Sequence, residues 1–242
     1  MRALVILPTL NEGPSIGTVI ELLLEIDSTD ILVVDDASTD GTAAVVERLR
    51  GPRVDLIERP SKLGLGSAYL LGFAWALKRP YDVVVEMDSD FSHDPRDAAR
   101  LVAALELADV VIGSRYVRGG RVENWGLFRR ALSQSGNRYA RALLGIEVAD
   151  ATNGLRAYRA EWLRSLDLAS ITSEGYSFQV EMAYRAVRRG ARVVEIPIVF
   201  TERVAGRSKM SRAIVLEALA RIALWALRDR VLPALHLRPG RP

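Results

Sequence analysis

Short apolar runs alternate along the first half of the chain with longer stretches of helical period. The runs cover residues 3–7, 31–34, 54–57, 83–85 and 110–112. Apolar residues between them recur every three to four positions, which predicts helices over residues 15–26, 42–50, 65–77 and 95–107. Ser15 and Asp94 stand where helix N-caps belong, and Pro95 suits a first helical turn. Strands and helices in alternation predict an α/β fold with a parallel sheet flanked by helices, because parallel strands need a crossover connection.

The pattern changes after Arg115, where paired glycines and a Trp-Gly step precede a helix predicted over residues 127–144. A strand is expected over 193–200, a polar basic loop over 201–212, an amphipathic helix over 213–227 and a frayed tail over 236–242. No repeat or low-complexity linker divides the chain. We therefore expect one domain over residues 1–212, with a front half of 1–115 and a back half of 116–212, followed by a helical segment and tail over 213–242.

Charge is distributed unevenly along the chain. Residues 1–100 hold 10 Lys and Arg against 17 Asp and Glu, whereas the remaining residues hold 23 against 13. The acidic half suits bound cations and the basic half suits bound anions. The sequence has no cysteine, which excludes disulfides, thiol nucleophiles and cysteine-ligated zinc, so a metal must be held by oxygen or imidazole.

The sequence predicts no transmembrane helix, because no stretch of about 18 uncharged apolar residues occurs. The nearest approach, residues 213–227, is interrupted by Glu217 and Arg221. The N-terminal apolar run is too short for a signal peptide and lacks a small-residue cleavage site, so it is interpreted as the first strand. We expect a cytoplasmic protein.

Acidic residues follow three of the predicted strands, at Glu12, Asp35, Asp36, Asp88 and Asp90. Ligands of open α/β sheets bind beyond the carboxyl ends of the strands. Turn chemistry alone explains the Asp-Asp-Ala-Ser-Thr-Asp-Gly stretch. Three acidic loops at one edge, however, need a cation or hydrogen-bond donors, because unpaired carboxylates repel each other. The Asp-x-Asp pattern offers hard oxygen ligands for Mg²⁺ or Mn²⁺ shared with a diphosphate.

Other patterns near these acids are weaker evidence for a catalytic or binding function. His93 could ligate a metal, but a cap or supporting role beside Asp94 and Pro95 is favoured. A Ser-His-Asp hydrolase triad is set aside, because adjacent residues rarely give its geometry and no Gly-x-Ser-x-Gly elbow exists. The Lys-Leu-Gly-Leu-Gly stretch at 62–66 is neither a Walker A loop nor a dinucleotide fingerprint, although its glycines could bring backbone close to a nucleotide.

Nine motifs follow one another in a fixed order. They are LPTLNE at 7–12, VVDDASTDGT at 33–42, KLGLG at 62–66, DSD at 88–90, GSRY at 113–116, RRALSQSGN at 129–137, DATNGLRAY at 150–158, GYSFQVE at 175–181 and RVAGRSKM at 203–210. In this order the chain resembles family 2 glycosyltransferases with the GT-A (Rossmann-like) fold, and within them the polyprenol (dolichol) phosphate mannose synthase group. The resemblance covers residues 3–212.

The resemblance implies transfer of mannose from GDP-mannose to a polyprenyl phosphate, with Mg²⁺ or Mn²⁺ as cofactor. The positions implied to contact the nucleotide are Pro8, Leu10, Glu12, Val34, Asp36 and Lys62. Those implied at the metal and the sugar diphosphate are Asp88, Ser89 and Asp90. Those implied to face the phosphates of donor and acceptor are Arg115, Arg129, Ser133, Arg203 and Lys209.

Two positions depart from the family pattern. Leu10 stands where the family usually has an aromatic residue, which removes the expected stacking on the base. Ser92 stands where several members use glutamine as a further metal ligand. With serine there, the resemblance implies a metal shell completed by water.

The basic residues of the back half have a solvated face as their simplest explanation. Residues 203–212, however, combine Arg and Lys with glycine in a loop without helical period, which favours a phosphate clamp. Nucleic acid is a poorer partner, because the acidic front half would repel it and no recognition motif occurs.

An acceptor phosphate monoester needs no general base, since its second pKa of about 6 leaves it mostly dianionic at pH 7. We expect a single in-line displacement at the anomeric carbon with inversion, which gives a β-linked product from an α-linked donor. A UDP-glucose or other UDP-hexose transferase to the same lipid is the alternative among enzymes. A lipid-phosphate binding module is the alternative outside them.

The predicted helix over residues 213–227 either packs on the core or lies at a membrane interface, with Trp225 at headgroup level and Arg228 and Arg230 on anionic lipid. A polyprenyl phosphate stays in the bilayer. We therefore expect a peripheral protein at the cytoplasmic face of the membrane, which binds the membrane surface directly or through a separate membrane-embedded protein.

Overall fold

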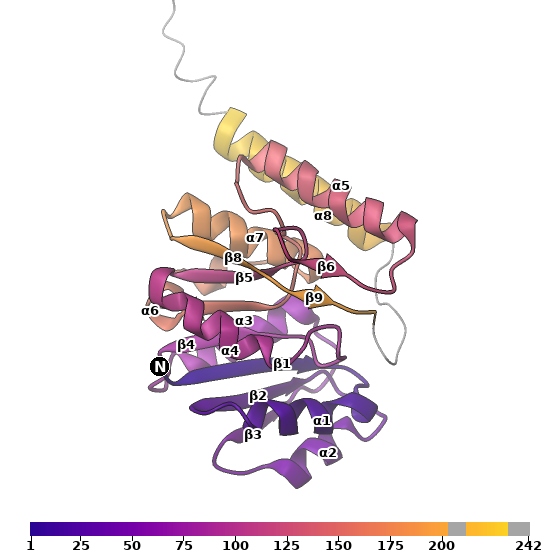
Figure 1. The fold of residues 1–242 in the computed structure, drawn as a ribbon, viewed down its shortest axis with the longest axis vertical. Helices are drawn as coiled ribbons and strands as arrows, with labels where there is room; N and C mark the ends of the chain where they lie inside the picture. The colour runs from indigo at the N-terminus through magenta and orange to yellow at the C-terminus, as the bar shows by residue number, and fades with distance from the viewer. Residues whose placement is uncertain (203–211, 232–242) are drawn as a thin grey trace, which may run out of the picture.

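Seven strands form one sheet in the computed structural model, which describes residues 1–202 and 212–231 (Figure 1). Their order across the sheet is β3-β2-β1-β4-β7-β5-β8. The strands are β1 (Ala3–Thr9), β2 (Thr29–Asp35), β3 (Val54–Glu58), β4 (Val83–Glu86), β5 (Val110–Ser114), β7 (Arg156–Arg159) and β8 (Val193–Pro197). Neighbouring strands are parallel except that β7 runs antiparallel between β4 and β5. The predicted mostly parallel sheet is confirmed.

Helices cover both faces of this sheet, because successive side chains of each strand point to opposite sides. On one side, Val5 and Leu7 of β1 lie in a buried cluster with α1 (Gly13–Leu24), α2 (Thr42–Leu49) and α4 (Asp97–Ala104). On the other side, Ile6 lies in a second cluster. The helices of that second side are α3 (Leu65–Ala76), α5 (Leu127–Leu144), α6 (Ala160–Arg164) and α7 (Gly175–Arg188).

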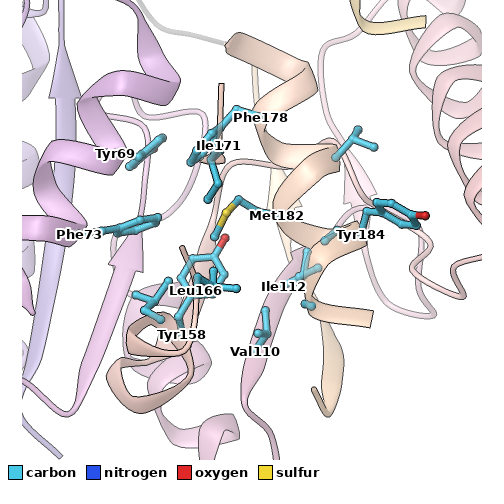
Figure 2. Packing of buried hydrophobic residues seen from close by; sticks show 14 of the residues in the cluster. Tyr69, Phe73, Val110, Ile112, Tyr158, Leu166, Ile171, Phe178, Met182 and Tyr184 are labelled. Atoms are coloured by element: carbon cyan, nitrogen blue, oxygen red, sulfur yellow. The ribbon is translucent and has the colours of Figure 1, made fainter. Parts of the chain in front are cut away.

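Aromatic rings join the two halves of the chain inside the second cluster (Figure 2). Tyr69 of α3 stacks on Phe178 of α7 with ring centroids 5.9 Å apart. Phe73 of α3 meets Tyr158 of β7 edge to face at 5.7 Å. Because α3 belongs to the front half and α7 and β7 to the back half, both halves share one core.

The C-terminal helix α8 (Arg212–Ala226), continued by a π-helical turn at Leu227–Val231, lies beside α5 at one end of the molecule (Figure 1). The Tyr139 hydroxyl of α5 donates to the Leu219 carbonyl at 3.1 Å. Ile222 and Ala226 are buried, and Trp225 stacks on Tyr184 of α7. The described part of this helix therefore packs on the core, while other side chains of α8 remain exposed.

Several local predictions differ from the structure. Helix α1 begins at Gly13, so Ser15 lies inside it and donates to the Glu12 carbonyl instead of capping the helix. Asp94 does not cap α4 either, because Pro95 and the next residue form a preceding turn in which the Arg96 amide donates to Asp94. A short 3-10 helix, Leu105–Leu107, then extends α4 to the predicted end.

The predicted strand over residues 193–200 is divided in two. After β8, the chain continues as β9 (Val199–Phe200), which pairs with β6 (Arg121–Val122) in a separate sheet. The buried Ile198 between them donates its amide to the Ser114 carbonyl at 3.1 Å. Four elements of the back half, β6, β7, α6 and α7, were not predicted, and a 3-10 turn at Leu168–Ser170 connects α6 to α7.

Candidate active site

The acidic loops meet at the carboxyl ends of β1, β2 and β4, as parallel strands in register require. Thr9, the last residue of β1, lies opposite Asp35 at the end of β2, and its hydroxyl donates to Asp35 Oδ1 at 2.7 Å. Asp35 also accepts from the Ser38 amide at 2.8 Å and from the Ser38 hydroxyl at 2.6 Å. Asp35 is buried, and its hydrogen bonds to Thr9 and Ser38 hold the loop after β2 in place.

A cavity of about 330 Å³ opens at this edge of the sheet. Eight of the predicted site residues line it: Pro8, Leu10, Glu12, Asp36, Lys62, Asp88, Ser89 and Asp90. The opposite wall comes from the back half and from α8, with Thr152, Gly154, Glu174, Gly175, Tyr176, Gln179 and Glu217. The cavity thus lies between the two halves that the sequence distinguishes.

The Asp-Ser-Asp turn after β4 is held tightly. Asp90 accepts a hydrogen bond from the Ser92 amide at 3.0 Å, and Phe91 between them adopts a positive φ of 60°. A bulky residue takes that conformation only where its surroundings enforce it. The Ser89 hydroxyl donates to the Pro8 carbonyl at 3.2 Å, which ties this turn to the loop after β1. The side chain of Asp88 keeps 30% of its surface exposed toward the cavity.

His93 lies behind these acids and is buried. Its Nε2 lies 2.9 Å from Asn153 Oδ1, while the Asn153 amide group donates to the Gly113 carbonyl at 2.5 Å. This arrangement places the proton of a neutral imidazole on Nε2. The other ring nitrogen, Nδ1, lies 4.0 Å from Asp88 Oδ2. Such contacts suit the supporting role expected for His93.

The lining of the cavity is rich in carboxylates, at Glu12, Asp36, Asp88, Asp90, Glu174 and Glu217. Lys62 is the one basic residue among the described residues that line it. Within the described ranges, no group of three or more acidic or histidine side chains is placed to hold a metal. The carboxylates of Asp88 and Asp90 both line the cavity, and oxygen donors of this kind suit Mg²⁺ or Mn²⁺.

Ser92, the third position considered for the metal, is buried. Its amide is used by Asp90, and its hydroxyl lies 3.5 Å from His93 Nδ1. The side chain does not line the described cavity. Val34, implied at the nucleotide, is likewise fully buried in the core.

Asp36 organises the loop that precedes α3. Its carboxylate accepts from the Leu63 amide at 3.2 Å and from the Gly64 amide at 3.0 Å, and it forms an ion pair with Arg59. Arg59 also donates to the Gly64 carbonyl at 2.8 Å and to the Ser67 hydroxyl at 2.7 Å. Nucleotide contact at Asp36 remains a prediction.

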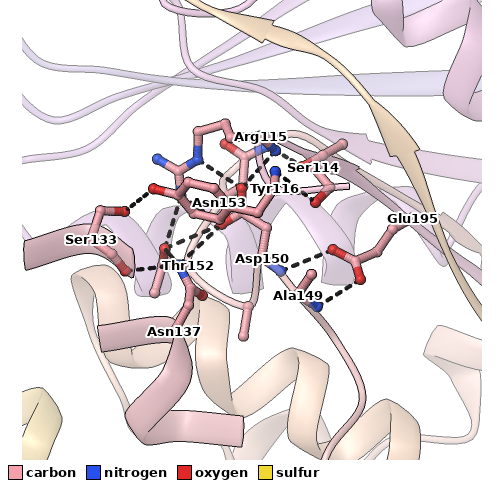
Figure 3. Close-up of polar contacts among 12 residues, drawn as sticks. Ser114, Arg115, Tyr116, Ser133, Asn137, Ala149, Asp150, Thr152, Asn153 and Glu195 are labelled. Atoms are coloured by element: carbon pink, nitrogen blue, oxygen red, sulfur yellow. Dashed lines mark hydrogen bonds and ion pairs between the residues drawn. The ribbon is translucent and has the colours of Figure 1, made fainter. Parts of the chain in front are cut away.

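Arg115 lies in a polar network beside the cavity (Figure 3). Its guanidinium donates to both oxygens of Asp150, at 2.7 and 2.6 Å, and to the Thr152 hydroxyl at 2.8 Å. Burial lowers the pKa of Arg115, but the buried Asp150 outweighs this and raises the pKa above its usual value. Asn137 of α5 also donates to Thr152, at 3.1 Å. Since Thr152 lines the cavity, the network connects α5 to the cavity wall.

Two of the other predicted phosphate contacts, Ser133 and Arg129, lie near this network. The Ser133 hydroxyl accepts from the Tyr116 hydroxyl at 2.7 Å. Arg129 lies over the Trp125 ring, 4.2 Å from its centroid, and pairs with Glu202. Arg203 and Lys209 lie outside the described residues. The roles of these four residues at a phosphate remain predictions.

A mostly parallel α/β sheet with an Asp-x-Asp cavity beyond its strand ends is the architecture of the GT-A glycosyltransferases. Sequence comparison agrees: the profile of glycosyl transferase family 2 matches residues 4–167, and the chain belongs to that family.

Two relatives match nearly the whole chain. The undecaprenyl-phosphate mannosyltransferase of Micrococcus luteus is 48% identical over 95% of this chain and 96% of its own length. The polyprenol monophosphomannose synthase of Mycolicibacterium smegmatis is 47% identical over 95% of this chain and 89% of its own length.

Solved structures share the fold. Glucosyl-3-phosphoglycerate synthase from Mycobacterium tuberculosis in complex with UDP has a TM-score of 0.66, with 20% identity over 93% of this chain and 79% of that chain. The same enzyme with Mn²⁺, UDP and glucosyl-3-phosphoglycerate has a TM-score of 0.64, with 20% identity over 94% and 79%.

The front wall of the cavity was predicted, whereas part of the back wall was not. Thr152, Gly154, Tyr176 and Gln179 occur within the motifs at 150–158 and 175–181, so those motifs already indicated their regions. Glu174 immediately precedes one motif, and Glu217 lies in a helix expected to pack on the core or on lipid. No local pattern indicated that either carboxylate faces the cavity.

Proposed function

We propose that the chain transfers mannose from GDP-mannose to a polyprenyl phosphate, with inversion, giving polyprenyl phosphate β-mannose and GDP. The observation that carries the proposal is the cavity itself. Asp88 and Asp90 lie between a front wall that carries the implied nucleotide contacts and a back wall that Thr152 connects to Arg115. The two mannosyltransferase relatives are 48% and 47% identical to this chain over 95% of its length. Their names support mannose as the transferred sugar and a polyprenyl phosphate as the acceptor.

In the proposed reaction an oxygen of the acceptor phosphate attacks the anomeric carbon of mannose. The bond from that carbon to the diphosphate breaks, and its electron pair leaves with GDP. The acceptor is mostly dianionic at pH 7, so no side chain has to remove a proton. The protein must instead hold two anionic groups close together, which requires positive charge and fixed geometry.

Asp88 and Asp90 would hold a bound Mg²⁺ or Mn²⁺, and the ion would supply the positive charge that stabilises the leaving diphosphate. Lys62 lines the cavity, where a phosphate can approach its side chain. Arg129, which keeps 24% of its side-chain surface exposed beside Glu202, would face a phosphate as the resemblance implies. Arg115 is occupied by Asp150, so it positions Thr152 and the cavity wall.

A membrane surface at the cytoplasmic face is the proposed location of the acceptor. No described helix is long and apolar enough to cross a bilayer. Of the exposed large apolar side chains, five lie on the two neighbouring helices α5 and α8, at Leu127, Phe128, Leu132, Leu216 and Leu224. Both helices lie at the same end of the molecule (Figure 1), which suits one surface resting on lipid.

The test is to incubate purified protein with Mn²⁺, a short polyprenyl phosphate and, in parallel, GDP-mannose, UDP-glucose and UDP-N-acetylglucosamine. Lipid-linked sugar is followed by mass spectrometry, and the product anomer is determined by NMR. We expect a β-linked product from GDP-mannose and at least a hundredfold slower reaction in Asp90→Ala. A product formed only from a UDP-sugar would overturn the donor, and an α-linked product would overturn the single displacement.

A further inference from the structure

Glu174 connects the back half of the chain to the loop before α3. It immediately precedes α7, and its carboxylate accepts from the Gly66 amide at 2.8 Å and from the Ser67 amide at 3.0 Å. These amides lie more than 100 positions earlier in the chain, in the first turn of α3. Helix α3 has no side-chain cap of its own, so Glu174 serves as its cap from a distance.

Two glycines make room for this contact. A Cβ atom at Gly64 would lie 2.5 Å from Glu174 Oε2, and a Cβ atom at Gly66 would lie 2.5 Å from the Ser173 carbonyl oxygen. Real Cβ atoms do not approach other atoms so closely. The glycines of the 62–66 stretch are therefore required by the segment at 173–174, a use that differs from the nucleotide approach expected for them.

Four backbone amides of this loop already donate to carboxylates. The Asp36 carboxylate accepts from the amides of Leu63 and Gly64. The Glu174 carboxylate accepts from the amides of Gly66 and Ser67. The start of α3 is thus no open cradle for a phosphate. The residues of this loop that line the cavity are Lys62, Gly64 and Leu65.

We propose that Glu174 is a positioning residue for the donor nucleotide. It fixes the loop at 62–67 against the start of α7, so that Lys62 on one wall and Tyr176 and Gln179 on the other keep the spacing that a nucleoside diphosphate needs. The inference rests on the proposed function only in taking a nucleoside-diphosphate sugar as the donor.

The experiment compares wild type with Glu174→Gln and Glu174→Ala, and uses Glu21→Gln on the exposed side of α1 as a control for loss of a carboxylate. Hydrogen exchange of the Gly66 and Ser67 amides is measured first, because it reports the contact without any catalysis. Titrations with GDP and with UDP, each with Mn²⁺, then give Kd. Steady-state rates with the accepted donor give KM and kcat.

We expect faster amide exchange at Gly66 and Ser67 in both variants, and a nucleotide Kd raised roughly three- to tenfold in Glu174→Ala, in keeping with the loss of one helix cap. Glu174→Gln keeps one carbonyl acceptor and should lie between wild type and the alanine variant. The donor KM should rise by a larger factor than kcat falls, while Glu21→Gln behaves as wild type.

Unchanged exchange at both amides, or unchanged nucleotide Kd in the alanine variant with a wild-type unfolding midpoint, would overturn the proposal. A drop in kcat with constant KM would also overturn it, since positioning of the donor acts on binding. If wild type binds and uses only a UDP-sugar, the donor assignment fails, but the same comparison made with UDP still decides the role of Glu174.

Discussion

Glu86 carries a carboxyl group inside a strand, and the sequence pattern did not indicate that this group is buried. It ends β4, it is fully buried, and its Oε1 accepts from the Tyr158 hydroxyl at 3.1 Å. Burial raises the pKa of Glu86 from 4.5 to about 7, although Arg156 acts in the opposite direction. In the unfolded chain Glu86 has its ordinary pKa, so the folded state binds an extra proton between pH 4.5 and 7.

The stability of the wild type should therefore fall, relative to Glu86→Gln, as pH rises through this window and then stay constant above it. Glutamine resembles the protonated form, so the two proteins should have similar free energies of unfolding at pH 4.5. At pH 8 the variant should be more stable by up to about 3 kcal/mol. Urea unfolding of both proteins at pH 4.5 and at pH 8 measures this difference in the free energy of unfolding. The same difference at both pH values would contradict the prediction.

Asp150 is a second buried carboxylate, but with a full set of partners. It has no exposed surface, and its carboxylate accepts from the backbone amide and the guanidinium of Arg115. Glu195 anchors the same loop, because its carboxylate accepts from the backbone amides of Ala149 and Asp150 (Figure 3). Removing its charge leaves the buried guanidinium unpaired.

We expect Asp150→Asn to lower the free energy of unfolding by about 3–5 kcal/mol, measured by urea denaturation. Asp27→Asn, at an exposed position, provides the control for loss of one negative charge and should change stability by less than about 0.5 kcal/mol. A loss below about 1 kcal/mol in Asp150→Asn would show that the network readily reorganises.

At the scale of elements, the contact between the start of α3 and the segment before α7 depends on Gly66. Alanine there would force apart the two elements, because its Cβ would meet the Ser173 carbonyl oxygen at 2.5 Å and Phe178 at 3.1 Å. We expect Gly66→Ala to destabilise the protein by about 1–3 kcal/mol, measured by thermal unfolding.

Gly136→Ala is the matched control, because nothing lies within 4 Å of a Cβ atom at that position in α5. Alanine is the better helix former, so this variant should gain up to about 1 kcal/mol. Equal effects of the two substitutions would contradict the close packing proposed for Gly66.

The elements predicted from sequence are those with long apolar periods. β1 to β5 and α5 were found because each is an uninterrupted run or stripe, and α5 has the predicted bounds. β7 was missed because its four residues, Arg-Ala-Tyr-Arg, contain no apolar run. Arg156 is nevertheless fully buried, where it donates to the carbonyls of Ala151, Asn153 and Gln179. Only the tertiary structure supplies those acceptors.

The residues of the candidate site also divide into those that local sequence patterns predict and those that only tertiary structure brings to the cavity. Asp88 and Asp90 were predicted because strand ends meet at one edge in any parallel sheet. Glu174 depends on where α7 begins, and Glu217 depends on how α8 packs, and neither is fixed by local pattern. The family resemblance located the motifs of the back half, but it did not show that Arg115 is held by Asp150.

At the scale of the whole molecule, the exposed apolar residues of α5 and α8 predict lipid association. We expect the double variant Phe128→Asp and Leu224→Asp to bind anionic lipid vesicles at least tenfold more weakly in a sedimentation assay, since each side chain contributes about 1.5–3 kcal/mol when buried. Leu107→Asp, at an exposed position in the 3-10 helix after α4, is the control and should bind as wild type. An equal loss of vesicle binding in the double variant and in Leu107→Asp would contradict a defined lipid-binding face.

The position of β7 has a consequence for how the chain can be divided. β4 and β5 belong to the first 115 residues, yet they do not pair with each other, because the later β7 lies between them. A fragment ending at Arg115 would therefore leave both strands with unpaired backbone edges, which are templates for self-association. The front and back halves follow one another along the sequence, but they share one sheet, so we expect them to fold only together.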